Sequence, residues 1–476
     1  MNEATRLRGL CALACTAGLL VAACSDDATS DGPTDAATDA AADVTADAGV
    51  DTDGETDAAL DTTTDVPTDV PLPTEECDES LPPIVLAHGF LASGDTWASF
   101  GQRFASNGWC VDRIVPYDWD SLDRASDPIP ALDALIDDLR DRFDADTVFL
   151  AGHSAGGGVG YDYLADPERA AKVAAYAHIG SFSNDAPAGA PTLHLYSLDD
   201  YAVTDGTDIP GATNVALEGV DHYGVATSAE SFAAVYEHFM GEAPATTDIV
   251  ASDVLLVSGR ALAIGTNAPM NEGPVEVWRI DSDTGLTVRD TPDHTFTTTP
   301  DGYWGPFAAE PGAHYAFAIV DPANPDVPVT FYYEPFTRTD AWVYLRSLPP
   351  VDSLAGILLA GLPREGDAAA HVNFTRSTGV IAGEDSITIN GIELLTEDTA
   401  AVEDTTIALF VYDVDADGET DATPDPTFEG FPFLAGYDVH LPAGDDQTIE
   451  VVYNDRTLRA RALRPGEEGV TVSVFN

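Results

Sequence analysis

The chain has 476 residues, of which 82 are acidic and 20 are basic, so its formal net charge is −62, while 44% of its positions are hydrophobic. This length allows two to four domains of roughly 100 to 200 residues, with enough apolar side chains for a sizeable core. A polyanion would be repelled by this charge, and the few basic residues form no cluster that could bind phosphates. The composition therefore excludes nucleic acid as a partner.

The first 24 residues have the order of an export signal. Arg6 and Arg8 precede an apolar run over residues 9–23, which is too short to span a bilayer as a helix. The run ends in Val21-Ala22-Ala23-Cys24, which resembles the lipobox of bacterial lipoproteins. This resemblance implies that residues 1–23 are a signal peptide, that Cys24 carries the lipid anchor in a membrane, and that Ser25 directs the protein to the outer membrane. The alternative is an ordinary signal peptide, with secretion.

Residues 24–76 are composed mainly of Asp, Ala, Thr, Val, Gly and Pro, and contain no Lys or Arg. Such a segment buries too little apolar surface to offset the conformational entropy lost on ordering. We expect a disordered acidic tether that is extended by self-repulsion. A calcium-collecting role is the alternative.

Two of the five cysteines lie within the signal peptide, and Cys24 is assigned to the lipid, which leaves Cys77 and Cys110. Two remaining cysteines in an exported chain favour a disulfide. In the chain-entropy model this bond would stabilise the fold by about 3 to 4 kcal/mol. Two free, buried thiols are the alternative.

Residues 77–245 alternate between short apolar runs and helical patterns. Strands are expected at residues 83–90, 111–116, 147–151, 173–179, 191–197 and 213–217, and helices at 96–107, 130–143, 155–166 and 228–239. Strands that alternate with helices predict an α/β domain with a doubly wound, mostly parallel sheet.

The strand at 147–151 runs into Gly152-His153-Ser154-Ala155-Gly156, a G-x-S-x-G sequence between a strand and a helix. A serine on such a strained turn holds its hydroxyl clear of the sheet, and the glycines permit the close approach of strand and helix. This context marks Ser154 as the candidate nucleophile.

A nucleophilic serine requires a base, which in turn requires an orienting acid. His88 and His153 belong to turn motifs, while His178 and His194 lie inside apolar, strand-like runs. His222 lies in a polar loop after the strand at 213–217, where the last strand of such a sheet would deliver a base.

The acid is Asp199 or Asp200, because both follow the strand at 191–197. The order serine, aspartate, histidine is that of an α/β hydrolase and differs from the orders in chymotrypsin-like and subtilisin-like proteases.

The motifs His88-Gly89-Phe90, Gly152-His153-Ser154-Ala155-Gly156, Tyr196-Ser197 and Gly219-Val220-Asp221-His222 resemble those of small α/β-hydrolase lipases over residues 81–240. In that family the acid stands four residues after the tyrosine, which implies Asp200 rather than Asp199. The resemblance also implies an oxyanion hole formed by the backbone N–H groups of Phe90 and Ala155. The expected chemistry uses no cofactor and no catalytic metal.

From residue 250 the sequence changes to short β-rich runs joined by Gly and Pro turns, which predicts one or two all-β, sandwich-like domains at residues 250–345 and 350–476. We expect the first to be antiparallel. The successive sequences D-x-x-T-G at 281–285, D-G at 301–302 and P-G-x-x-Y at 311–315 resemble those of prealbumin-like carbohydrate-binding folds. The combination with a lipase-like domain resembles archaeal-type lipases, whose β domain assists in handling long acyl chains.

Alternating aspartates at 413, 415 and 417, followed by Gly418 and Asp421, resemble the start of a calcium loop, but the twelfth position is Pro424 rather than a bidentate Glu. An EF-hand is therefore not expected, and both a single calcium site and a polar hairpin remain open.

These observations predict a serine hydrolase of carboxylic esters, with lipid acyl esters as the expected substrate. The alternatives are a hydrolase of polyesters or other acyl polymers, and a surface binding module that uses the hydrolase domain as a scaffold. Residues 118–129, with Trp119 and Leu122, are either a short mobile flap over the site or an ordinary surface loop.

Overall fold

The computed structural model describes residue 72 and residues 75–476, except 124, 183–188, 205, 350–355, 357–358, 360, 397–404 and 430–432. The expected signal peptide, Cys24 and almost all of the tether lie outside the described residues. Among the helices of the described part, none has the length and apolarity to cross a bilayer. Residues 72–476 form one compact unit.

The N-terminal half of this unit is built on a six-stranded sheet in the order β2-β1-β3-β4-β5-β6, in which every pair is parallel. The prediction of a doubly wound α/β domain is confirmed. Its strands are β1 (Ile84–Ala87), β2 (Ile114–Tyr117), β3 (Val148–His153), β4 (Val173–Ile179), β5 (Thr192–Ser197) and β6 (Thr213–Leu217).

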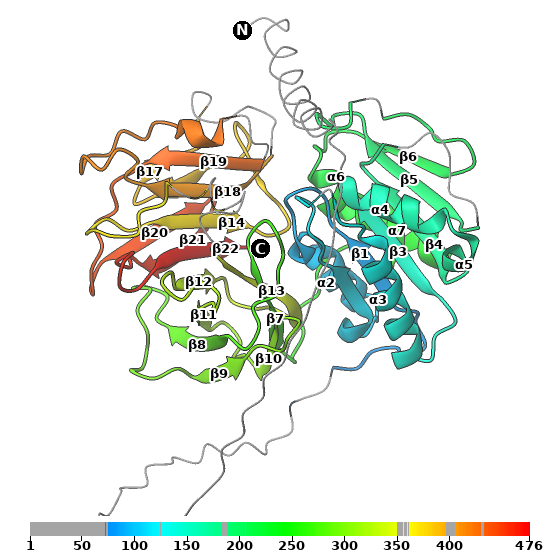
Figure 1. Ribbon diagram of the computed structural model, residues 1–476, viewed down its shortest axis with the longest axis horizontal. Coiled ribbons are helices and arrows are strands. Elements are labelled where there is room, and N and C mark those ends of the chain that lie inside the picture. The colour runs from blue at the N-terminus through cyan, green and yellow to red at the C-terminus, as the bar shows by residue number, and fades with distance from the viewer. Residues whose placement is uncertain are drawn as a thin grey trace, which may run out of the picture. The chain divides into compact units, whose positions relative to one another are not determined.

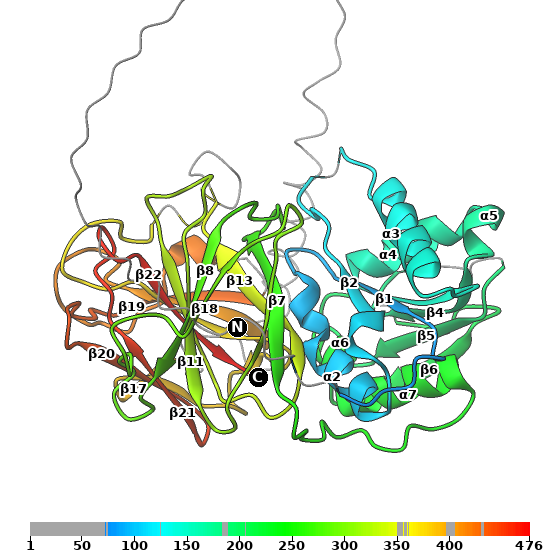
Figure 2. The ribbon, with the colours of Figure 1, turned by 90° about the horizontal axis from the view of Figure 1, so that it is seen from below.

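Helices cover both faces of this sheet, as Figures 1 and 2 show. One apolar core lies between the sheet and the helices α3 and α4, and a second lies between the sheet and the helices α2 and α7. The helices are α2 (Ala98–Ser106), α3 (Ile129–Arg142), α4 (Ala155–Leu164), α5 (Pro167–Ala170), α6 (Gly224–Thr227) and α7 (Ala229–Met240), with short 3-10 turns at Gly94–Trp97 and Val111–Arg113.

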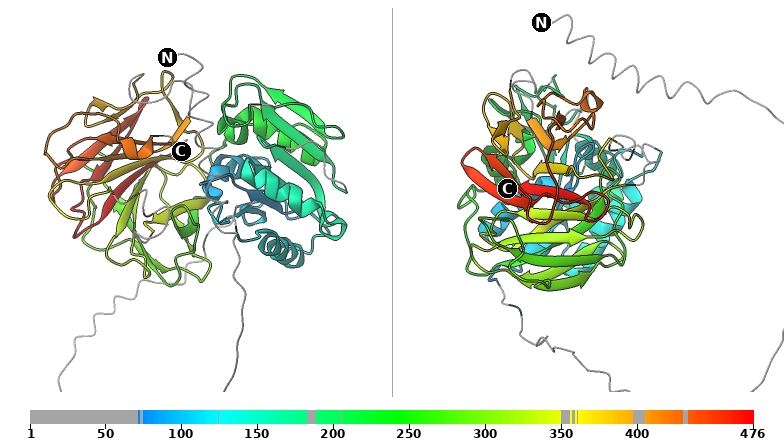
Figure 3. Two further views of the ribbon diagram at one scale, coloured as in Figure 1. Left: turned by 45° about the horizontal axis from the view of Figure 1, so that its top comes forward. Right: turned by 90° about the vertical axis from the view of Figure 1, so that its left-hand side faces the viewer.

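The C-terminal half is a β region of three sheets, whose arrangement can be followed in Figure 3. A three-stranded sheet has the order β10-β7-β13, a four-stranded sheet has the order β17-β16-β20-β21, and a nine-stranded sheet runs from β15 to β9. The strands are β7 (Leu256–Ala263), β8 (Pro274–Ile280), β9 (His294–Thr297), β10 (Tyr303–Ala308), β11 (His314–Ile319), β12 (Val329–Tyr333), β13 (Asp340–Ser347), β14 (His371–Thr375), β15 (Val380–Ile381), β16 (Ile387–Ile389), β17 (Ile392–Glu393), β18 (Thr405–Tyr412), β19 (Phe433–Asp438), β20 (Thr448–Tyr453), β21 (Arg456–Arg461) and β22 (Val470–Phe475).

The expectation that residues 250–345 form an antiparallel domain is wrong for one pair of strands, because β13 pairs with β7 in parallel. The last strand, β22, also lies parallel between β12 and β14. Strands from 250–345 and from 350–476 thus share one sheet and one apolar core. Side-chain alternation reports which face of a strand is buried, but it does not report the direction of the neighbouring strand.

The β region completes the core of the hydrolase half. Trp342 and Tyr344 of β13 are 1% exposed and belong to the cluster beneath α2 and α7. A Cβ at Gly101 of α2 would lie 2.4 Å from the Trp342 ring, so glycine is what allows this helix to approach β13 so closely. The two halves therefore fold against each other through a shared, close-packed interior.

Candidate active site

Ser154 occupies the sharp turn between β3 and α4, with φ 52° and ψ −120°. A Cβ at Gly152 would lie 2.3 Å from the carbonyl oxygen of Gly156, and a Cβ at Gly156 would lie 2.4 Å from that of His88. Gly152 thus allows β3 and α4 to approach each other closely, and Gly156 allows the turn to pack against the end of β1. A non-glycine residue held at positive φ is strained, which is typical of a nucleophile turn.

His222 and Asp200 are hydrogen-bonded at the carboxyl edge of the sheet, with 2.7 Å between Nδ1 and Oδ2. Their side chains are 4% and 1% exposed, so the pair is shielded from water. The second oxygen of Asp200 accepts the N–H groups of Ala202 and Val203, each at 2.8 Å. The carboxylate is thereby held in one orientation and fixes the imidazole.

Electrostatics favour an ionised Asp200. Burial opposes ionisation, but the hydrogen bond and charge of His222, together with the two backbone N–H groups, outweigh it and lower the pKa of Asp200. The neighbouring Asp199 is exposed and accepts the N–H of Gly219 at 2.6 Å instead. Of the two candidate acids, the structure places Asp200 against the histidine.

His153 is a residue of the site that sequence reasoning assigned only to the turn. Its Nε2 donates to the carbonyl oxygen of His222 at 2.9 Å, and the two rings lie 4.7 Å apart. Burial, followed by the proximity of His222, lowers the pKa of His153 to about 3, so it stays neutral. Because His153 directly precedes Ser154, this bond ties the histidine loop to the serine turn.

The two expected oxyanion donors belong to segments that lie next to Ser154. Ala155 is the first residue of α4, where backbone N–H groups are free of helical partners. Phe90 follows Gly89, and a Cβ on Gly89 would lie 3.2 Å from the Cβ of Ser154. The structure therefore brings the loop that carries Phe90 against the serine turn.

An apolar cavity of about 160 Å³ opens beside these residues, between the hydrolase half and the β region. Phe90, Leu91, Leu122 and Tyr223 line it from the hydrolase half. The β region lines it with the apolar residues Ile264, Leu359, Phe374, Ile407, Ala408, Phe410, Phe433 and Leu434. Polar and charged residues also line it, namely Ser93, Asp95, Thr96, Arg346, Thr375 and Arg376. The cavity thus belongs to both halves of the chain.

Phe433 connects the cavity to the buried pair, and the sequence did not single it out as a site residue. Its ring stacks on His222 with 6.0 Å between ring centroids, and lies 6.1 Å from Tyr201. This phenylalanine has φ 71° and begins β19, next to a register shift in the pairing of β19 with β18. Only the folded β region brings it to a histidine that lies 211 positions earlier in the chain.

The first two residues of the segment 118–129 are held in place by contacts, in contrast to the expected mobile flap. The indole of Trp119 stacks on His88, and its Nε1 donates to the His88 carbonyl at 3.1 Å. The carboxylate of Asp118 is 1% exposed and accepts Arg260 Nη1 at 2.6 Å and the Tyr344 hydroxyl at 2.7 Å. Residues 118 and 119 are therefore anchored to both halves, while Leu122 lines the cavity.

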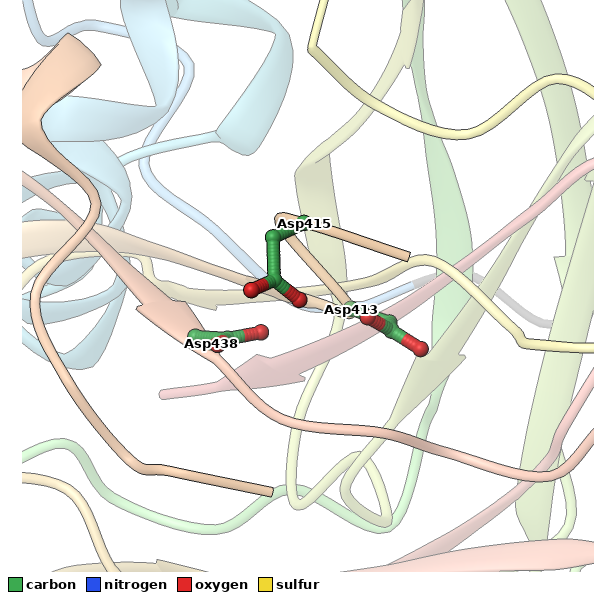
Figure 4. Close-up of side chains that lie close together, drawn as sticks. All are labelled: Asp413, Asp415 and Asp438. Carbon is green, nitrogen blue, oxygen red and sulfur yellow. The ribbon is translucent and has the colours of Figure 1, made fainter. Parts of the chain in front are cut away.

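Of the two other groups expected from the sequence, the disulfide forms, whereas the acidic loop comes together only in part and gains Asp438, which was not expected there. Cys77 and Cys110 form a disulfide, with 5.0 Å between their Cα atoms. Asp413, Asp415 and Asp438 place carboxylate oxygens within 4.8 Å of one another (Figure 4), whereas Asp417 and Asp421 are not part of this group. Hard oxygen ligands of this kind suit calcium.

Comparisons with known proteins agree with this architecture. Residues 82–223 match the family model of the alpha/beta hydrolase fold, residues 253–350 match that of the lipase C-terminal domain, and residues 371–464 match a further C-terminal domain model. Among curated proteins, none matches this sequence.

Several solved structures show low similarity. The mature form of the Bacillus licheniformis lipase BlEst2 is 16% identical, with coverage of 32% of this chain and 90% of that chain and a TM-score of 0.26. Its propeptide form is 14% identical, with coverages of 67% and 84% and a TM-score of 0.29. A predicted CIB-like hydrolase from Thermoplasma acidophilum is 15% identical, with coverages of 33% and 84% and a TM-score of 0.26.

Residues 82–223 therefore form an α/β-hydrolase domain, which is followed by a β region whose first part matches the lipase C-terminal domain. The domain models carry this assignment, whereas the TM-scores are too low to add to it. In this combination of domains the protein resembles lipases and esterases.

Proposed function

We propose that the protein hydrolyses carboxylic esters through a Ser154–His222–Asp200 triad, with lipid acyl esters as its substrates. The observation that carries this proposal is the buried Asp200–His222 hydrogen bond at 2.7 Å, tied through His153 to the strained Ser154 turn. An adjoining apolar cavity of about 160 Å³ supplies room for an acyl chain.

In the first half of the reaction, Ser154 Oγ attacks the ester carbonyl carbon while His222 Nε2 takes the hydroxyl proton. Asp200 accepts the hydrogen bond of Nδ1, which leaves Nε2 free as the base and stabilises the imidazolium that forms. The carbonyl oxygen becomes an oxyanion that accepts the N–H groups of Phe90 and Ala155. The alcohol leaves with the proton from His222.

In the second half, His222 takes a proton from water, and the resulting hydroxide attacks the acyl-serine ester. The proton returns to Ser154 as the carboxylic acid is released. Each loss of one oxyanion donor is expected to cost about 100- to 1000-fold in turnover.

The test is hydrolysis of p-nitrophenyl butyrate by the wild type and by Ser154→Ala. We expect the substitution to reduce kcat by at least about 1000-fold, since the residual rate would rest on the oxyanion hole alone. Wild-type turnover by Ser154→Ala would overturn the proposal. Failure of the wild type to hydrolyse any ester or to react with a fluorophosphonate would favour a binding module instead.

The mainly apolar lining of the cavity favours the acyl chain of a lipid over a segment of a polymer. A polyester chain would have to pass the site at both ends, while a single acyl chain needs only one opening. Release of fatty acid from emulsified triacylglycerol, compared with release of monomers from a polyester film, distinguishes the two substrates.

For location, we propose export and anchoring through a lipid on Cys24. Palmitate labelling of cells that express the wild type or Cys24→Ala tests this, because only the wild type should carry the label. Label on both variants, or on neither, would contradict the anchor.

A further inference from the structure

Asn267 is a residue of the β region that lies inside the hydrolase half. It belongs to the loop between β7 and β8, is 8% exposed, and has φ 56°, a left-handed conformation that asparagine tolerates better than most residues. Its backbone N–H donates to Ala263 O at 3.0 Å, which closes the loop tightly. The β region thus holds this side chain in a defined place.

The side-chain amide of Asn267 contacts three acceptors that belong to the hydrolase half. Its Nδ2 lies 2.9 Å from Ala92 O, 3.0 Å from Trp119 O and 3.2 Å from His88 Nε2. Carbonyl oxygens can only accept, so the atom that faces them must be the NH₂ group. One amide therefore joins both ends of the segment 88–92 to Trp119.

These contacts determine which nitrogen of His88 carries the proton. His88 Nδ1 lies 2.8 Å from Gly89 O, and a carbonyl accepts, so Nδ1 is the protonated nitrogen. Nε2 is then an acceptor with a single lone pair, which faces both Trp119 N and Asn267 Nδ2, each at 3.2 Å, so these two donors share it. Burial lowers the pKa of His88, which agrees with this neutral form.

The carbonyl that His88 holds is part of the expected oxyanion hole. The C=O of Gly89 and the N–H of Phe90 belong to the same planar, trans peptide unit, in which the two groups point in opposite directions. A hydrogen bond that fixes the C=O of Gly89 therefore also fixes the direction of the Phe90 N–H. The segment is further held by Leu91 N, which donates to Ser121 Oγ at 2.9 Å.

We propose that Asn267 is a positioning residue of the oxyanion hole: through His88 and the carbonyl oxygens of Ala92 and Trp119, the β region aims the Phe90 N–H at the reacting oxygen. This inference rests on the proposed ester hydrolysis. It makes the β region necessary for turnover of every ester, including short ones that do not fill the cavity.

The main test compares Asn267→Asp with Asn390→Asp. Aspartate keeps the size of the side chain and tolerates the backbone conformation, but it presents acceptors where Ala92 O and Trp119 O require donors. Asn390 is an exposed residue with φ 49° whose Oδ1 accepts Glu450 N at 2.9 Å, a bond that aspartate retains. The control therefore adds the same charge to the same region in a similar backbone conformation.

We expect Asn267→Asp to lower kcat for p-nitrophenyl butyrate by about 10- to 100-fold with KM changed by less than about threefold, because a misplaced donor weakens transition-state binding alone. Asn390→Asp should keep wild-type kcat. The same fall is expected for the acetate and the octanoate. A kcat within about twofold of the wild type, or a change confined to KM, would overturn the inference.

A second variant covers the case in which Asn267→Asp does not fold. Asn267→Gly removes the amide without adding charge, and glycine adopts φ 56° readily. It should retain a thermal transition close to that of the wild type while showing the same fall in kcat. If both variants lose the folded state, the role of Asn267 is structural and the inference is overturned.

The proposed function and this inference fail in distinguishable ways. Full activity of Ser154→Ala would overturn the triad, whatever Asn267 does. An active wild type, an inactive Ser154→Ala and an unchanged kcat in Asn267→Asp would leave the triad intact and overturn only the role of Asn267.

Discussion

Filling the cavity should shorten the acyl chain that the enzyme accepts. Ala408 lies on β18, is 1% exposed and lines the cavity next to its cross-strand partner Phe374. Ala408→Leu adds three carbon atoms on this wall, so the space that they fill is no longer available to about three methylenes of a bound chain. Short acyl groups that stop before this wall lose nothing.

Buried methylenes set the size of the effect. At about 0.8 kcal/mol for each methylene, three displaced methylenes cost about 2.4 kcal/mol, or roughly 60-fold in kcat/KM. In the wild type, kcat/KM should rise up to about fourfold per added methylene until the cavity is full. Ala408→Leu should stop this rise three carbons earlier.

The assay is kcat/KM for p-nitrophenyl esters from acetate to decanoate. Ala308→Leu is the matched control, because Ala308 is an exposed strand residue of β10 that does not line the cavity. The control should follow the wild-type series. An equal loss at all chain lengths in Ala408→Leu, or no loss at any, would show that the acyl chain does not occupy this cavity.

Asp200→Asn should reduce kcat by about 10 000-fold because it favours the wrong tautomer of His222, while Asp199→Asn should keep kcat near that of the wild type. A large loss of kcat in Asp199→Asn and none in Asp200→Asn would show that Asp199 is the acid. As the pH is lowered from about 6.5 towards 3, the free energy of unfolding should decrease by about 1.4 kcal/mol per pH unit for each buried histidine whose pKa lies at about 3, because the unfolded chain takes up the proton first. Urea unfolding at several pH values measures this, and a free energy that does not change with pH contradicts it. These histidines are His153, His178 and His371. Cys110→Ser should cost about 3 to 4 kcal/mol of unfolding free energy relative to the oxidised wild type, and equal stability of the two would show that the bond contributes nothing. Calcium should raise the Tm of the wild type but not of Asp438→Asn, and equal shifts in both would place any calcium site elsewhere.

The hydrolase half could be predicted from sequence because its signals are local. The apolar runs of β1 and β3, and the glycines around Ser154, follow from short stretches of chain whose chemistry permits few other structures. His222 could be placed because the carboxyl ends of parallel strands meet at one edge of the sheet, and the same argument limited the acid to Asp199 or Asp200. The choice of Asp200 came from the resemblance to small α/β-hydrolase lipases.

The parts supplied by the β region could not be predicted in the same way. Asn267 and Phe433 reach the site through strand pairings whose parallel or antiparallel direction leaves no trace in the alternation of side chains. Neither residue lies in a motif, although an asparagine between two expected strands favours a tight turn. Trp342 illustrates the same limit, because its pattern indicates burial without indicating that it packs in the hydrolase core.

The most direct test of the account is the site of covalent labelling. The protein is treated with a fluorophosphonate, digested, and the modified residue is identified by mass spectrometry. The account predicts one adduct, on Ser154, with loss of esterase activity in proportion to labelling and no adduct in Ser154→Ala. An adduct on another residue that abolishes activity, or full esterase activity with Ser154 completely modified, would contradict it.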